Sequence, residues 1–273
     1  MHLVDNFSQK RKVLILDSDK KKKFTYFLNE PISSKGICFF IHGIGDSSTT
    51  FSKLINTAYL EEYSTLYYDL PGFGINKNIK IKEFKDNFEI LSSLIYLHSQ
   101  STKNNCFVGH SMVGLILLLT LVNQDFITNK FNILTIEPSI TPVDLDFFRH
   151  IQEPPIGIGY DGFVENSKSH IGQSIYSKEY YDNLTNSSDL TFKKCVKDIN
   201  DNFFVYQSLI FQSKMPFIYT YGQRSLNPNF RENIKQHSNI EVKSFHMAKH
   251  WVHIDAEKEF CDFFTNDFLN NNS

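Results

Sequence analysis

The sequence has little of several features that mark large classes of proteins. Lys and Arg together number 28 against 30 Asp and Glu, so the formal charge at pH 7 is only −2. A chain with so balanced a charge has no basic excess that would suggest binding to nucleic acid, and we expect no nucleic-acid partner. No uninterrupted apolar stretch approaches the roughly 18 residues that a membrane-spanning helix needs, so the sequence predicts no membrane span.

Cysteine is also scarce and scattered. Cys38, Cys106, Cys195 and Cys261 are far apart and form no Cys-x-x-Cys motif, which argues against a disulfide framework and against a cysteine metal site. The opening segment, MHLVDNFSQKRKV, contains no apolar stretch of the kind found in secretory signals. We therefore expect a cytoplasmic protein whose cysteines are reduced and pack as small apolar side chains.

Apolar residues, by contrast, are plentiful and follow an alternating pattern. The 273 residues are 41% hydrophobic, enough to bury the core of a single α/β domain. Strand-like runs are Lys12–Leu16, Phe24–Leu28, Gly36–Gly43, Thr65–Leu70, Asn105–Gly109, Phe131–Pro138, Met215–Gly222 and Ile240–His246; helix-like segments are Ile81–His98, Val113–Val122 and Asp255–Leu269. This alternation predicts an α/β fold with a mostly parallel sheet flanked by helices. The first two strands form an opening hairpin, whose turn is the lysine run in Asp19–Phe24.

One segment interrupts the alternation. About 75 residues separate Pro138 from Met215, far more than an ordinary connection between a helix and a strand. We interpret residues 139–214 as a helical cap inserted after the sixth strand, and residues 1–138 and 215–273 as the core. Gly157, Gly159 and Gly162 match a Gly-x-Gly-x-x-Gly pattern inside this cap. Since no strand precedes them, they favour a hinge over a dinucleotide site.

Four motifs occur in a recognisable order along the chain. They are FFIHGIGD at 39–46, YYDLPGFG at 67–74, VGHSMVG at 108–114 and AKHWVHIDAEKEF at 248–260. They resemble the oxyanion loop, the turn after the fourth strand, the nucleophile elbow and the catalytic-histidine loop of the α/β-hydrolase fold superfamily. The resemblance covers nearly the whole chain outside the cap. It implies a capped serine hydrolase that uses neither a metal nor a cofactor.

The third motif sets a serine between a strand and a helix. A serine hydroxyl is a weak nucleophile at neutral pH, and a strand-to-helix elbow presents the Ser111 oxygen to a neighbouring base. The Met112 N–H would lie at the helix N-terminus, where the helix dipole favours a developing oxyanion. The resemblance implies the Ile44 N–H as the second donor. Val113 departs from the pattern, since a small residue usually stands there, so we expect either an opened turn or a damaged site.

Histidines in the fourth motif are candidates for the base. His250 best matches the histidine loop of the superfamily and is predicted to be the base, with His253 and His246 as alternatives. Three clustered histidines also suggest a metal site, but no carboxylate completes an HExxH pattern, so none is predicted. We expect His110 to pack beside the elbow and His42 to brace the oxyanion loop.

The acid of the triad is the least obvious residue. The superfamily commonly places Asp after the seventh strand, where this chain has Ser225. Glu137 ends a buried apolar strand instead, and an unpaired carboxylate there would be costly unless a histidine met it. We predict Glu137 as the acid, with Asp144 and Asp146 as more distant alternatives.

These residues predict a serine hydrolase that cleaves a small or medium acyl ester, thioester or lactone. A triad of Ser111, His250 and Glu137 would act through an acyl-enzyme, and the partner would be a small-molecule acyl substrate. The same triad supports C–C bond hydrolysis or acyl transfer as alternatives. A further alternative is a catalytically silent ligand-binding protein, which Val113 and Ser225 motivate.

Overall fold

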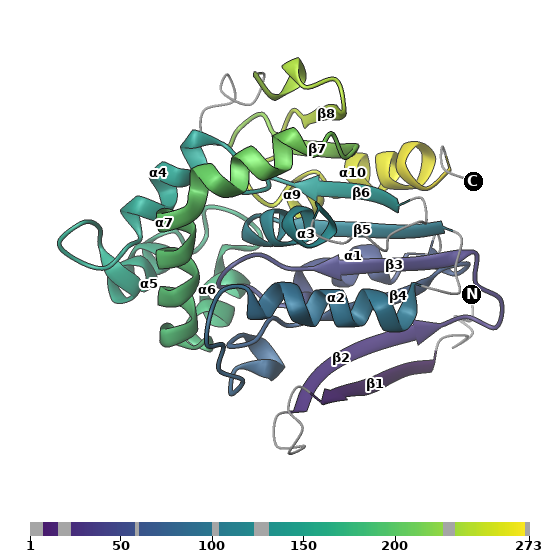
Figure 1. Ribbon diagram of the computed structural model, residues 1–273, viewed down its shortest axis with the longest axis horizontal. Helices are drawn as coiled ribbons and strands as arrows, with labels where there is room; N and C mark the ends of the chain where they lie inside the picture. The colour runs from purple at the N-terminus through teal and green to yellow at the C-terminus, as the bar shows by residue number, and fades with distance from the viewer. Residues whose placement is uncertain are drawn as a thin grey trace.

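One eight-stranded sheet organises the part of the chain that the computed structural model describes, residues 8–15, 23–57, 60–99, 104–122, 131–225 and 233–270. Its order is β1-β2-β4-β3-β5-β6-β7-β8 (Figure 1). The strands are β1 (Ser8–Ile15), β2 (Lys23–Glu30), β3 (Gly36–Ile41), β4 (Ser64–Tyr68), β5 (Asn104–His110), β6 (Phe131–Ile136), β7 (Phe217–Gly222) and β8 (Ile240–Phe245). From β4 through β8 all neighbours are parallel, which confirms the predicted fold class.

The first two strands pair antiparallel and extend one edge of the sheet. Ser8 lies opposite Glu30 and Ile15 opposite Lys23, and β2 in turn pairs antiparallel with β4. The predicted opening hairpin is therefore confirmed for its two strands. Its lysine turn lies outside the described residues.

Strand β3 is buried on both faces, as its unbroken apolar sequence predicts. Ile37, Phe39 and Ile41 belong to one core cluster, and the alternate residues Cys38 and Phe40 belong to another on the opposite face. Helices α2 (Asp86–His98) and α3 (Met112–Val122) contribute to the first cluster. Helices α1 (Ser52–Ile55), α9 (Val252–Asp255) and α10 (Glu257–Phe263) contribute to the second.

The last helical segment is divided, in contrast to the single helix predicted over Asp255–Leu269. Ala256 has φ −117° and ψ 44°, which ends α9 before α10 begins, and a π-helical segment, η5 (Phe264–Leu269), follows α10. The side chain of Asp255 accepts a hydrogen bond from the Lys249 N–H at 2.9 Å. The hydrogen bond thus ties α9 to the loop that precedes it. We attribute the break between α9 and α10 to this contact.

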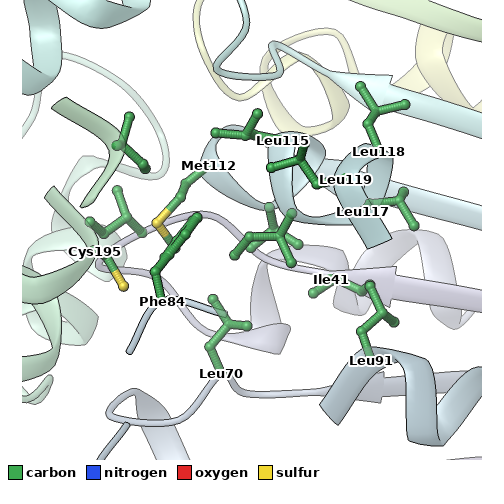
Figure 2. Packing of buried hydrophobic residues seen from close by; sticks show 14 of the residues in the cluster. Ile41, Leu70, Phe84, Leu91, Met112, Leu115, Leu117, Leu118, Leu119 and Cys195 are labelled. Atoms are coloured by element: carbon green, nitrogen blue, oxygen red, sulfur yellow. The ribbon is translucent and has the colours of Figure 1, made fainter. Parts of the chain in front are cut away.

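Four helices lie between β6 and β7: α4 (Pro142–His150), α5 (Gly159–Ser169), α6 (Ser177–Thr185) and α7 (Asp189–Gln212). Figure 1 shows them gathered beyond one end of the sheet. Figure 2 shows Met112 of α3 beside Phe84 and Cys195, and Cys195 comes from α7. The insertion therefore shares a hydrophobic core with the sheet. That residues 139–214 form a separate cap domain stays a prediction.

Two cysteines that are 68 positions apart in the sequence lie side by side. Cys38 of β3 is the register partner of Cys106 on β5; both are buried and both are free thiols. Burial raises the pKa of Cys38, as does its hydrogen bond with Cys106.

Within the described residues, no helix combines the length and the apolar character that crossing a membrane requires.

Candidate active site

Ser111 occupies the turn between β5 and α3 with a left-handed backbone. Its φ is 55°, in a region of backbone conformation that residues other than glycine seldom adopt. Its N–H donates to the Ile136 carbonyl at 2.8 Å, and its carbonyl accepts from the N–H groups of Gly114 at 2.9 Å and Ser139 at 3.2 Å. These bonds hold the serine at the end of the sheet, as an elbow requires.

The side chain of Val113, next to this turn, packs into the core. The valine side chain is fully buried in the hydrophobic cluster that α3 shares with α2. The close backbone approach falls one position later, at Gly114, where a Cβ would lie 2.6 Å from the Pro138 Cβ. Gly109 faces Gly114 in turn, with a Cβ that would lie 3.2 Å from the Gly114 Cα. Small residues thus stand at Gly109 and Gly114, where the two backbones approach closely, and the effect of Val113 on the site stays a prediction.

The loop after β3 carries Ile44, whose N–H is predicted to be an oxyanion donor. Ile44 is buried and lines the same cavity as Ser111. The Leu70 N–H donates to His42 Nε2 at 2.9 Å, so Nδ1 carries the proton and donates to the Gly43 carbonyl at 2.8 Å. His42 therefore braces this loop against the turn after β4. Met112 is the first residue of α3, whose first N–H groups have no acceptor within the helix.

Helix α6 packs directly on this loop. Gly45 has φ 75°, and a Cβ there would lie 2.8 Å from the Tyr180 hydroxyl and 2.9 Å from Leu184 Cδ1, so only glycine fits. The Tyr180 hydroxyl also donates to the Ile44 carbonyl at 3.3 Å. The position of the Ile44 backbone thus depends on α6 as well as on β3.

The structure separates the three candidate histidines. His250 lines the cavity together with Ser111, and its side chain is 39% exposed. His253 is buried, stacks on Phe51 at 4.8 Å and has its Nε2 3.0 Å from the Thr50 hydroxyl. Burial, followed by the charge of nearby His250, lowers the pKa of His253 to about 3. Its surroundings are those of a neutral core residue.

His246 and His110 have other surroundings. His246 is exposed, and its Nδ1 lies 2.9 Å from the Gln223 side-chain oxygen. His110 is buried beside the elbow and donates from Nε2 to the His250 carbonyl at 3.1 Å. Burial is also the main reason that its pKa lies well below the ordinary value.

Glu137 lies immediately after β6 and points at His250. Its side chain is fully buried, and its backbone φ is 48°. Carboxylate oxygen Oε1 accepts from the Gly222 N–H at 2.9 Å. Oxygen Oε2 accepts from the Ser225 hydroxyl at 2.7 Å and contacts His250 Nδ1 at 3.1 Å. With Nδ1–H bound to the carboxylate, Nε2 of a neutral His250 is an acceptor.

The alternative acids have other contacts. Asp144 accepts hydrogen bonds from the N–H and the hydroxyl of Thr141 in a capping box at the start of α4. Asp146 is exposed and pairs with Arg149 at 3.8 Å. Of the predicted acids, Glu137 is the one that the structure brings to His250.

A cavity of about 590 Å³ lies between the ends of the strands and the inserted helices. Ser111, His250 and Ile44 line its floor, while Val143, Phe147 and Phe163 supply apolar walls from α4 and α5; polar side chains from the α5–α6 region include Asn166, Ser167, His170, Gln173, Ser174 and Ser177. Its volume is that of a typical small-molecule site. In the described part of the chain, no group of three or more His, Cys, Asp or Glu side chains is arranged to hold a metal ion.

Two further side chains at this site were not assigned from the sequence. Asp46, in the FFIHGIGD motif, is buried at the cavity wall, and the hydroxyl of Ser225 binds the carboxylate of Glu137 rather than replacing it. A buried carboxylate at the end of an apolar motif was the available signal for Asp46. Its partners lie in the insertion and in the histidine loop, which no local pattern connects.

Sheet order, strand-to-helix turn and flanking helices are those of the α/β-hydrolase fold. A family model described as serine aminopeptidase, S33, matches residues 32–130, which run from before β3 to beyond α3. A carboxylesterase structure from Nitrososphaera gargenis superposes with a TM-score of 0.72 at 17% identity, covering 96% of this chain and 98% of that one.

Two curated relatives align at low identity. A putative 2-succinyl-6-hydroxy-2,4-cyclohexadiene-1-carboxylate synthase from Haemophilus influenzae is 21% identical over 84% of this chain and 96% of its own length. A putative esterase/lipase from Mycoplasma genitalium is 24% identical over 38% of this chain, and this chain spans only 40% of that relative's length.

Proposed function

We propose that the chain is a serine hydrolase that cleaves a small or medium acyl ester, thioester or lactone through an acyl-enzyme. The observation that carries this proposal is the 3.1 Å contact of buried Glu137 with His250 Nδ1, in a cavity that His250 lines together with Ser111. The esterase names among the relatives and structural neighbours support the same reaction class.

The reaction begins at Ser111. His250 Nε2 takes the proton from the Ser111 hydroxyl as Oγ attacks the acyl carbon, and Glu137 stabilises the imidazolium that forms. The carbonyl oxygen becomes an oxyanion, which the N–H groups of Ile44 and Met112 bind. The C–O or C–S bond to the leaving group then breaks, and His250 returns the proton to the leaving atom. Water, activated by His250, releases the acid and restores Ser111.

The proposed substrate class follows from the cavity walls. Val143, Phe147 and Phe163 form an apolar surface suited to an acyl or aryl group, and the volume matches a small or medium substrate. In this proposal residues 139–214 act as the cap, because α4 and α5 supply these walls. The apolar side therefore takes the acyl part, and the polar α5–α6 side takes the leaving group.

A fluorophosphonate probe tests the proposal, because it labels only an activated serine. Wild-type protein should be labelled at Ser111 and should hydrolyse short p-nitrophenyl esters. Ser111→Ala should lose both properties while its circular dichroism and melting temperature stay unchanged. An unlabelled wild type would indicate a silent binding protein, and ester turnover by Ser111→Ala within a few-fold of wild type would reject Ser111 as the nucleophile.

A C–C bond reaction on the same triad is the second candidate. The Haemophilus influenzae relative, which aligns over most of this chain, is described as a synthase and so supports a reaction other than ester hydrolysis on this fold. Fluorophosphonate labelling without turnover of any ester, thioester or lactone in a substrate panel would favour this candidate over ester hydrolysis.

A further inference from the structure

Asp46 is a buried carboxylate that the proposed reaction leaves without a role. It lies two residues after Ile44, is only 1% exposed and forms part of the cavity wall. Burial is the main reason that its pKa is raised, although nearby His42 and several hydrogen bonds lower it. A charge removed from water in this way is costly unless the surrounding groups are arranged to receive it.

Four donors from different parts of the chain converge on this carboxylate. Oxygen Oδ1 accepts from the Ser47 N–H at 2.8 Å, the Tyr176 hydroxyl at 2.7 Å and the Asn183 side-chain amide at 3.1 Å. Oxygen Oδ2 accepts from the Trp251 indole N–H at 3.3 Å. Hydrogen bonds to an ionised acceptor are stronger than neutral ones, so the four together offset much of the desolvation cost.

The donors come from three segments that form the candidate site. Ser47 belongs to the loop that carries Ile44, Tyr176 and Asn183 belong to the α6 region, and Trp251 directly follows His250. Trp251 also packs against Tyr176, with ring centroids 5.6 Å apart. A single carboxylate therefore connects the oxyanion loop, the wall of the insertion and the histidine loop.

We propose that Asp46 is a positioning residue, which fixes the Ile44 backbone and the His250 loop relative to each other and to α6. This inference rests on the proposed function, since the role that it assigns belongs to the same hydrolytic site. Asp46 touches neither the reacting atoms nor the proton that moves. It acts by holding the oxyanion donor and the base in the geometry that the reaction needs.

Asp46→Asn separates this role from simple stabilisation. Oδ1 of the new amide keeps its three donors, and this fixes its orientation, so that the amide NH₂ takes the place of Oδ2. Two donors then face each other at Trp251, and the link to the histidine loop is lost. Because the substitution also removes a buried charge, we expect the melting temperature to stay close to that of the wild type.

The experiment measures two properties of wild type, Asp46→Asn and Tyr176→Phe. The first is the maximal rate constant for fluorophosphonate labelling of Ser111, which should fall at least about tenfold in Asp46→Asn, with little change in the probe concentration that gives half-maximal rate. The second is the fluorescence of Trp251, the single tryptophan of the chain, whose accessibility to acrylamide should rise. Tyr176→Phe keeps its ring against Trp251 and should give a smaller loss of rate.

Glu179→Gln is the matched control. Glu179 also joins α6 to the loop after β3, through a hydrogen bond from Thr49 at 2.8 Å, but this contact is exposed. Glutamine removes the charge but can still accept from the Thr49 hydroxyl, so this substitution should leave both measurements unchanged. Wild-type labelling rates and unchanged Trp251 quenching in Asp46→Asn would overturn the inference. Failure of wild type to label would reject the proposed function, and Trp251 quenching, which needs no catalysis, would still decide whether Asp46 holds the histidine loop.

Discussion

Glu137→Gln is the perturbation with the most specific expected outcome. The carboxylate lies 3.1 Å from His250 Nδ1, and two unit charges at that distance interact by about 5 kcal/mol at an effective dielectric constant of about 20. Because the His250 side chain is 39% exposed, solvent screens part of this energy. A loss between half and all of it corresponds to a fall in kcat of about 10²- to 10⁴-fold.

The neutral amide also fails to match the donors around it. If its oxygen keeps the Gly222 N–H, its NH₂ faces Ser225 and the Nδ1–H of His250; if it flips, the NH₂ faces the Gly222 N–H instead. In either orientation the amide NH₂ faces another N–H donor. The first orientation also favours the unproductive tautomer of the His250 imidazole.

The assay is steady-state hydrolysis of a short p-nitrophenyl ester by wild type, Glu137→Gln and Ser225→Ala. Ser225→Ala removes a hydrogen bond to the same carboxylate but keeps its charge, so its kcat should fall only a few-fold. Asp placed at position 225 in the Glu137→Gln background should restore part of the activity from the neighbouring strand. A kcat for Glu137→Gln within threefold of wild type would refute the reasoning.

The remaining predictions concern the histidines and the elbow. His250→Ala should lose activity as completely as the loss of the nucleophile, whereas exposed His246→Ala should hydrolyse the ester at nearly the wild-type rate; the reverse ranking in the same assay would move the base. Burial lowers the pKa of His253 to about 3, so as the pH falls this histidine is protonated in the unfolded chain before it is protonated in the folded one. The free energy of unfolding should therefore fall by up to about 1.4 kcal/mol per pH unit from pH 6.5 toward pH 3. Urea titrations should show a shallower decline in His253→Phe. Gly114→Ala should lower the free energy of unfolding by about 1–3 kcal/mol, because its Cβ would lie 2.6 Å from Pro138; a urea midpoint equal to wild type would contradict this.

The fold was predictable from the sequence wherever burial leaves a mark on neighbouring residues. GICFFI is apolar throughout because both of its faces are covered, and the run after Ser111 is apolar because α3 is buried on every side. The break at Ala256 was missed because it depends on a contact between Asp255 and the Lys249 backbone. Such a contact leaves the helical spacing of the phenylalanines unchanged.

The candidate site was predictable in part. Ser111, Glu137 and His250 each follow or precede a recognisable apolar run, so their approach to one cavity follows from the ends of parallel strands. The contacts of Asp46 with Tyr176 and Trp251 join residues 130 and 205 positions apart. No periodicity states which inserted helix packs on which loop, and the sequence therefore left Asp46 unassigned.

The left-handed backbones of Ser111 and Glu137 have a consequence for the evolution of this chain. Each L-residue in that conformation costs roughly 1–2 kcal/mol, and both stand in the candidate site with φ values of 55° and 48°. Backbone bonds to Ile136 and Thr220 hold the two turns whichever side chains they carry. The fold thus gives up backbone stability at two positions where chemistry is expected. Descendants released from selection for catalysis would therefore tolerate glycine at position 111 without loss of stability, whereas glycine at position 137 would take the acceptor from the Gly222 N–H.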